Sequence, residues 1–302
     1  MAKRTVCLLI VLLSVLSQNS FAQQKSLEQI TFSDSTRHGF PNWSPCGKFI
    51  FYGSSNQKTC NTMRIPSDGG DAVKLTNYFA QHARCSPDGK YLVFDAEFGS
   101  LIQLCSSEGG NPIRIVPESI PITHSGMPCW SPDGKYIAFH SNGVLWTLEL
   151  GSGKCRKILE MDKKLVAPFD WTPDGNNIIA DVRDTINRGE ADIWKIPLNE
   201  NKDEAKRLTF MNGYQVEPNV SPDGSMIVFM SWKDRESRMS LFVISSDGGE
   251  PVQITFDEGH DTEACWSPDG KKIAFSSTRA GYWAIWVMEP DIQFIREELN
   301  IK

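Results

Sequence analysis

Short stretches of alternating apolar and polar residues recur along the chain, and each follows a turn that contains glycine. Residues 136–139 (Tyr-Ile-Ala-Phe) and 272–275 (Lys-Ile-Ala-Phe) are two of them. A period of two is typical of a strand with one buried face. The preceding turn is Ser-Pro-Asp-Gly, in which Pro presets φ, Asp accepts bonds from backbone amides and Gly adopts positive φ. The pattern predicts an all-β fold.

The turn belongs to a signature of five residues that occurs six times. The copies begin at Trp43, Cys85, Trp130, Trp171, Val220 and Trp266. They are 42, 45, 41, 49 and 46 residues apart. In most periods the alternating strand is followed by a third strand, often with Trp, a Gly-rich turn and a short fourth strand. Four short strands in each period of 40 to 50 residues predict a six-bladed β-propeller of four-stranded antiparallel blades.

The last period lacks its fourth strand, and the start of the chain supplies a candidate. Residues 27–32 (Leu-Glu-Gln-Ile-Thr-Phe) repeat the Gln-Ile-Thr-Phe pattern of residues 253–256. We therefore expect residues 27–32 to complete the last blade and close the ring, which removes open sheet edges. Residues 290–302 carry apolar side chains at near-helical spacing and are expected to form a tail with a short amphipathic helix packed on the propeller.

The first 22 residues are set apart from this repeat. Lys3 and Arg4 precede an apolar run of about 11 residues, and Ser20 and Ala22 are small residues spaced for signal-peptidase cleavage. The run is shorter than the ~20 residues that span a bilayer. We predict a signal peptide at residues 1–22, a mature propeller at 23–302, and a periplasmic or secreted protein with no membrane span.

Composition limits the remaining classes of function. A formal charge of -6 argues against a nucleic-acid surface, which carries excess Lys and Arg. Seven cysteines remain after the signal peptide, and an odd number cannot all pair. We expect most of these cysteines to be thiols in the core, and one disulfide is the alternative. The chain has no G-x-S-x-G elbow, no P-loop and no C-x-x-C pair.

The six signatures resemble the W-S-P-D-G-K-x-I-A-F repeats of the TolB-like propeller family in every predicted blade. The resemblance implies the fold and, for TolB, a periplasmic protein of a cell-envelope complex. Residues 23–25 alone precede the closing strand here, so the domain that precedes the TolB propeller is expected to be absent. The repeats are also similar to those of prolyl-oligopeptidase-type enzymes and of oligogalacturonate lyase, whose channel holds a metal bound by His and a neighbouring polar residue.

Candidate ligand-binding residues come from the strand that leads into each signature, which should line the central channel. Side chains one, three and five residues before the signature are expected to share its inward face. At these positions blades five, six, one and two carry the ionisable candidates, which are His38, His82, Arg84, Glu217, Asp261 and Glu263. His38, His82, Glu217 and Glu263 could hold a divalent cation, the one cofactor that this set suggests.

Two functions follow from different interpretations of these residues. The first is an exported, non-catalytic propeller that binds a protein of the cell envelope or a small or glycan ligand at one face of the ring. The second is a metal-assisted lyase or hydrolase of glycans that uses the cluster of His and carboxylate side chains. Polar lining that only contacts water is a third interpretation. We expect the protein to be a monomer, and we expect no nucleic-acid partner.

Overall fold

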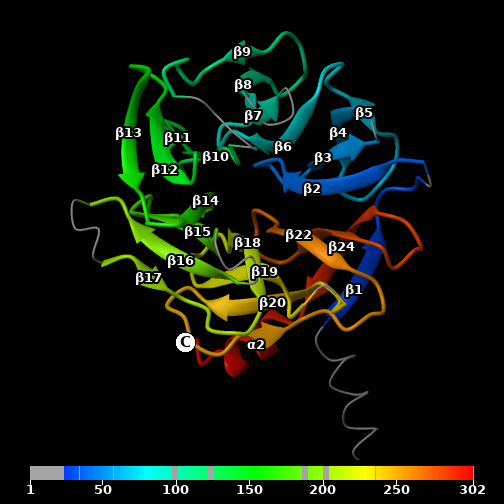
Figure 1. The fold of residues 1–302 in the computed structure, drawn as a ribbon. Coiled ribbons are helices and arrows are strands. Elements are labelled where there is room, and N and C mark those ends of the chain that lie inside the picture. The colour runs from blue at the N-terminus through cyan, green and yellow to red at the C-terminus, as the bar shows by residue number, and fades with distance from the viewer. Residues whose placement is uncertain are drawn as a thin grey trace, which may run out of the picture.

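The computed structural model describes residues 24–33, 35–56, 58–96, 101–120, 126–185, 190–199, 204–234 and 236–301. The predicted signal peptide lies outside these residues. Within them, antiparallel strands form four sheets of four strands and one larger sheet. The larger sheet consists of two groups that share only the parallel pair Ala191 and Tyr214. We number the four-stranded groups units 1 to 6 in chain order (Figure 1).

The units have the following strands. Unit 1 is β2 (Arg37–Trp43), β3 (Phe49–Ser55), β4 (Cys60–Pro66) and β5 (Val73–Lys74). Unit 2 is β6 (Ala80–Cys85), β7 (Tyr91–Ala96), β8 (Leu101–Ser106) and β9 (Ile113–Arg114). Unit 3 is β10 (Cys129–Trp130), β11 (Tyr136–Ser141), β12 (Val144–Glu149) and β13 (Lys154–Leu159).

Unit 4 is β14 (Lys164–Trp171), β15 (Asn177–Asp184), β16 (Ala191–Pro197) and β17 (Lys206–Arg207). Unit 5 is β18 (Tyr214–Val220), β19 (Met226–Trp232), β20 (Ser240–Ser245) and β21 (Val252–Gln253). Unit 6 is β22 (Asp261–Trp266), β23 (Ile273–Ser277) and β24 (Ala284–Pro290), with β1 (Gln24–Gln29) as its outer strand. The helix α2 (Ile292–Glu298) follows β24.

Each signature folds as its residue types predict. In unit 3, the Ser131 hydroxyl donates to Asp133 Oδ1 at 2.7 Å, and the Tyr136 amide donates to Ser131 Oγ at 2.9 Å. Gly134 has φ of 70°, which a residue with a Cβ adopts at a cost. The same Ser-to-Asp bond recurs in units 2, 5 and 6. Hydrogen bonds within the signature therefore form the turn, and the turn leads directly into the second strand of the unit.

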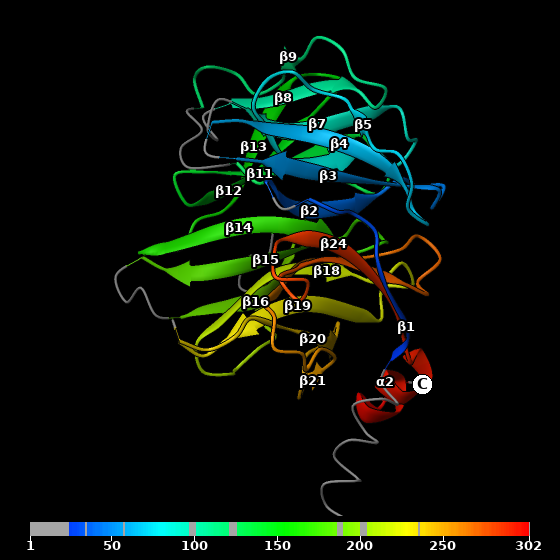
Figure 2. The ribbon, with the colours of Figure 1, turned by 90° about the vertical axis from the view of Figure 1, so that its right-hand side faces the viewer.

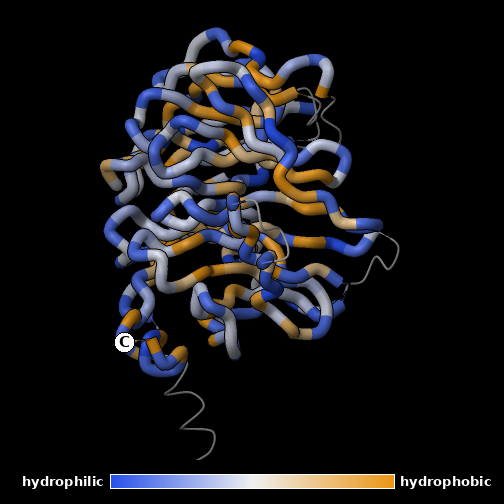
Figure 3. The backbone as a smooth tube through the Cα atoms, turned by 90° about the vertical axis from the view of Figure 1, so that its left-hand side faces the viewer, coloured by the Kyte–Doolittle hydropathy of each residue, from blue (hydrophilic) through white to orange (hydrophobic). Residues whose placement is uncertain are grey.

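The first strands of successive units contact one another, and β2 also contacts β22 (Figures 1 and 2). The hydrophobic clusters lie between neighbouring units, as in the cluster of Trp43 and Tyr52 with Cys265 and Ile285. Figure 3 shows apolar stretches along the strands and polar stretches at the turns. The first strands are thus brought to the centre of the molecule, where the candidate residues were predicted.

The outer strand of unit 6 begins three residues before the predicted closing strand. The structure has β1 at Gln24–Gln29, paired antiparallel with β24, where residues 27–32 were expected. Ile30 and Thr31 follow the strand and stay attached, because the Ile30 amide donates to Ile285 O at 2.8 Å and the Ile285 amide donates to Thr31 Oγ1 at 2.8 Å.

Two further observations concern the rest of the chain. The seven described cysteines are free thiols, four of them buried. No helix in the described ranges is long and apolar enough to cross a membrane.

Candidate functional site

A β-bulge interrupts the first strand in five of the six units, as the shifted pairing between Gly39 and Asn42 shows for β2. At the third position before the signature, five residues that are not glycine have φ between 46° and 58°. They are Phe40, His82, Met127, Glu217 and Glu263. Bulges and positive φ at such residues are costly and cluster at functional sites. The repeat therefore holds a strained residue at the same place in five units.

The bulge overturns the expected alternation. His38 pairs with Ser54 and Asn42 with Phe51, so the two side chains lie on opposite faces of unit 1. His38 instead packs its ring 5.0 Å from that of Tyr52, and its Nδ1 lies 2.8 Å from Thr31 Oγ1. Burial lowers the pKa of His38.

Asp261 departs from the expectation in the same way, because it pairs with Ser277 on the far side of its own bulge. It is buried and accepts from Arg279 Nη2 at 2.8 Å. The expectation that positions one, three and five share a face is therefore wrong for His38 and Asp261.

The residues at the bulges do converge. The ring of His82 lies 4.1 Å from that of Phe40, and both line a narrow cavity with Arg84, Met127 and Pro168. Arg84 also lines a cavity of about 180 Å³. Among the residues that the structure describes, no hydrogen bond or ion pair engages the Arg84 guanidinium. Arg84 is therefore a cation that a ligand from either cavity can reach.

The second cavity at Arg84 contains a carboxylate held by its neighbours. Asp170 lines it together with Asn42 and Asn219. Asp170 Oδ2 accepts from Asn219 Nδ2 at 2.7 Å and from the Val220 amide at 2.9 Å. Burial raises the pKa of Asp170 to about 6, although these bonds and the charge of Arg84 oppose the shift.

Glu263 uses both carboxylate oxygens within the protein. Oε1 pairs with Arg37 Nη2 at 2.5 Å, and Oε2 accepts from the Phe40 amide and from Ser276 Oγ, each at 2.7 Å. Arg37 is half-exposed, and its guanidinium lies over the ring of Trp283 at 4.6 Å. Glu263 thus joins unit 6 to the bulge of unit 1.

A second group of polar residues, here called the second ring, lies on the second strands of four units. The sequence patterns did not lead us to these residues as candidate functional groups. Ten residues after the start of the signature, the second strands place Asp95, His140, Asp181 and Ser276 in units 2, 3, 4 and 6, all buried. A polar residue at that fixed distance, inside strands that are otherwise apolar, is the signal that could have found them.

Two members of this second ring bind groups of the next unit. Asp95 Oδ2 lies 2.6 Å from His82 Nδ1, and Asp95 Oδ1 accepts from the Gly126 amide at 3.0 Å. Asp181 accepts two bonds of 2.9 Å from Arg183 and one of 3.4 Å from the Glu217 amide. Carboxylates of units 2, 4 and 6 therefore each accept a hydrogen bond from a backbone amide at or beside the third position before the signature of the following unit.

Glu217 differs from these carboxylates. Its Oε2 atom is buried and has no hydrogen-bond partner among the described residues. The pKa of Glu217 is raised to about 8, first by burial and then by the negative charge of Glu263, while Arg183 opposes the shift. A neutral carboxylic acid at pH 7 can both donate and accept a hydrogen bond. A buried carboxyl with such a shift is a candidate functional group.

The four residues proposed from the sequence as metal ligands do not form a metal-binding group. No set of three or more His, Cys, Asp or Glu with suitable placement occurs within the described ranges. His38 lies on the other face of its strand, His82 is bonded to Asp95, and Glu263 is occupied by Arg37 and Ser276.

Solved structures with this arrangement of strands belong to one class. A putative TolB from Agrobacterium tumefaciens has a TM-score of 0.65 at 21% identity, over 88% of this chain and 98% of that one. TolB from Acinetobacter baumannii has a TM-score of 0.59 at 18% identity, over 87% and 65%. An oligogalacturonate lyase from Vibrio parahaemolyticus has a TM-score of 0.57 at 12% identity, over 87% and 96%. The protein is a β-propeller with a TolB-like fold.

Sequence comparison gives the family. No protein-family model matches the chain. The uncharacterized protein Atu1656 of Agrobacterium fabrum is 31% identical over 231 residues, which are 69% of this chain and 73% of that protein. The chain belongs to the same family as Atu1656. The Tol-Pal system protein TolB of Francisella tularensis is 32% identical over 163 residues, which are 52% of this chain and 35% of TolB.

Proposed function

We propose that this chain is an exported, non-catalytic TolB-like propeller that binds a protein partner or a small ligand at the mouth of its central channel. In this proposal the signal peptide at residues 1–22 is removed, and the six units form a closed ring that acts as a monomer. The binding residues are His82, Arg84, Glu217 and Glu263, between units 5, 6, 1 and 2.

The observation that carries the proposal is the Glu217 carboxyl, whose buried Oε2 has no described partner. A buried polar atom without a hydrogen bond costs roughly 1–3 kcal/mol. A ligand that supplies a hydrogen bond to Oε2 recovers that cost, so the channel favours a ligand with a polar group at this place.

The other channel groups define the chemistry of the ligand. Arg84 offers a guanidinium that suits an anionic or carbonyl oxygen. Arg37 presents a half-exposed cation beside Trp283 at the Glu263 side. A polar peptide segment or a small molecule with an acceptor toward Arg84 and a hydroxyl or amide toward Glu217 fits this arrangement.

The non-catalytic assignment rests on how the other acidic groups are used. Asp181 is occupied by Arg183, Asp95 by His82 and Glu263 by Arg37. Groups held in this way stabilise the junctions between units and are poorly placed to transfer protons to a ligand.

The test is site-specific photo-crosslinking in cells that express the full-length chain. A photoreactive residue at Phe40, which lines the channel, should give a discrete adduct, whereas one at Phe210, exposed on the outside, should not. The adduct should disappear in the double variant Glu217→Gln/Glu263→Gln, which keeps the size of both side chains. An adduct that survives this double change would contradict the proposal.

The same material tests the enzymatic alternative. Stoichiometric Mn, Ca or Zn in the purified protein, lost on His82→Ala, would favour a metal-assisted lyase or hydrolase of glycans over a binding protein.

A further inference from the structure

The helix α2 fills a groove between units 5 and 6. Ile295 on its inner face is fully buried and belongs to the same hydrophobic cluster as Met226, Val243 and Trp266. The next residue, Arg296, pairs with Asp223 and donates to Ser225 Oγ at 3.2 Å. The chain therefore seats one of its own helices by an apolar anchor and an adjacent Arg that reaches the signature Asp.

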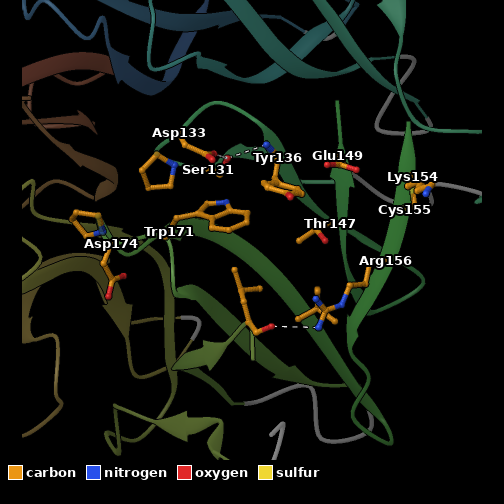
Figure 4. A pocket seen from close by; sticks show the side chains of 15 residues that line it. Ser131, Asp133, Tyr136, Thr147, Glu149, Lys154, Cys155, Arg156, Trp171 and Asp174 are labelled. Atoms are coloured by element: carbon orange, nitrogen blue, oxygen red, sulfur yellow. Dashed lines mark hydrogen bonds between the residues drawn. The ribbon is translucent and has the colours of Figure 1, made fainter. Parts of the chain in front are cut away.

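Of the corresponding grooves, the one between units 2 and 3 is open, and so is the larger one between units 3 and 4. The latter forms a cavity of about 660 Å³, lined among others by Asp133, Tyr136, Thr147 and Trp171 (Figure 4). The repeat relates these four residues to Asp223, Met226, Val243 and Trp266, since the registers of β11 with β12 and of β19 with β20 match. The surface that holds Ile295 and Arg296 in one groove is thus present and uncovered in the other.

The larger open groove also carries charge that the filled one lacks. Strand β13 has six residues where β21 has two, and it places Lys154 and Arg156 along the wall. Arg156 occupies the place of Val252, and it donates to Leu198 O of unit 4 at 3.3 Å. Asp133 and Asp174 stand at the signature end. The groove is therefore acidic at the signature end and aromatic in the middle, and its opposite wall carries Lys154 and Arg156 together with Glu149.

We propose that the groove between units 3 and 4 binds a short amphipathic helix of a partner protein. The helix presents an Ile or Leu side chain to Trp171 and Tyr136, a basic residue to Asp133, and an acidic residue to Lys154 or Arg156. A helix laid into a groove through one apolar face is a common mode of peptide recognition. This site does not include the residues proposed at the channel, although Trp171 lines both this groove and the cavity at Arg84.

The probe is a labelled synthetic peptide of residues 290–302 of this chain, titrated against the mature protein by fluorescence anisotropy. It carries Ile295, Arg296 and two Glu residues in the required order. We expect saturable binding, and no binding of the same peptide with Ile295→Asp. The protein variant Asp133→Asn should weaken binding about two- to fivefold, as the loss of an exposed ion pair does.

The matched control is Asp88→Asn. Asp88 has the same turn, the same bond from its Ser and the same neighbouring Lys as Asp133, but it lines the equivalent open groove between units 2 and 3, where Ile113 takes the place of Arg156. This change should leave binding unaltered. Thr147→Trp, which fills the cavity, should abolish binding. Glu149→Trp, at a half-buried position in the same lining, serves the same purpose if Thr147→Trp does not fold.

Three outcomes would overturn the inference. They are no saturable binding up to about 1 mM peptide, binding that ignores both cavity-filling variants, and binding that responds to Asp223→Asn but not to Asp133→Asn. The last would place the peptide in the groove of α2. The double variant Glu217→Gln/Glu263→Gln should not affect peptide binding, so this site and the channel site can fail separately.

Discussion

Glu217 and Glu263 occupy the same position in successive units, yet their surroundings differ. Glu263 has three described donors on its two oxygens, whereas Oε2 of Glu217 has none. The difference arises from neighbours on other strands, because Arg37 reaches Glu263 and Asp181 approaches the Glu217 backbone. The same residue type is therefore a junction between units at one position and an available polar group at the other.

The raised pKa of Glu217 makes stability depend on pH. A carboxyl with a pKa near 8 in the folded protein and 4.5 in the unfolded chain opposes folding increasingly as pH rises between these values. Glu217→Gln removes this cost and should be more stable than the parent by about 1–3 kcal/mol at pH 9, and little different at pH 5. Urea denaturation at the two pH values measures the difference. An equal effect at both would show that Glu217 ionises normally.

The close approach of Gly39 to Glu263 gives a second residue-scale prediction. A Cβ at Gly39 would lie 2.6 Å from Glu263 Oε2 and would displace it from the Phe40 amide and Ser276. We expect Gly39→Ala to destabilise the protein by about 1–3 kcal/mol. Gly53→Ala is the matched control, since its nearest contact would be 3.5 Å. Similar losses in both variants, measured by chemical denaturation, would argue against this reason.

At the scale of elements, the strands differ in how far their own sequence defines them. The signature turns and the second strands follow from local residue types. The outer strand β1 does not, because residues 24–26 are polar, lie at a sheet edge and carry no alternating apolar pattern. β1 reaches back to Gln24 because β24 extends to Pro290, the residue that pairs with Gln24.

Deleting residues 27–32 should cost several kcal/mol. The deletion removes most of the pairing with β24, the buried Ile30 and the bonds of Thr31 to the Ile285 backbone. Burial of two or three core side chains is worth about that much. Thermal unfolding of the deletion variant checks the prediction, with Phe32→Ala as control because Phe32 is 72% exposed. A deletion variant that melts like the parent would show that this strand does not hold unit 6.

At the scale of the whole molecule, the export of the chain remains a prediction from its first 22 residues. We expect the exported protein to begin at Gln23, with residues 1–22 removed by signal peptidase. Intact mass and N-terminal sequencing of protein recovered from the periplasm or the medium measure this. Retention of residues 1–22 on exported protein would contradict the cleavage site.

The TolB-like fold links this chain to proteins with different names. TolB and oligogalacturonate lyase share the arrangement of strands at identities of 18% and 12%. At these identities the fold is shared and the function has to come from the site.

The sequence by itself determined the β class, the repeating unit and the residues that reach the centre. These depend on local chemistry, namely the Ser-Pro-Asp-Gly turn, the alternation of the following strand and the fixed distance between copies. His82, Arg84, Glu217 and Glu263 were predicted in this way as binding residues, and that role stays a prediction.

The tertiary structure decided which of the candidates face one another. The bulge in the first strands of five units reverses the alternation, and this moved His38 and Asp261 to the other face. The partners of the buried carboxylates come from neighbouring units, as Asp95 with Gly126 shows. Packing between units also left one groove filled by α2 and another open. A one-dimensional pattern does not contain such contacts, because they depend on segments that meet only when the units assemble.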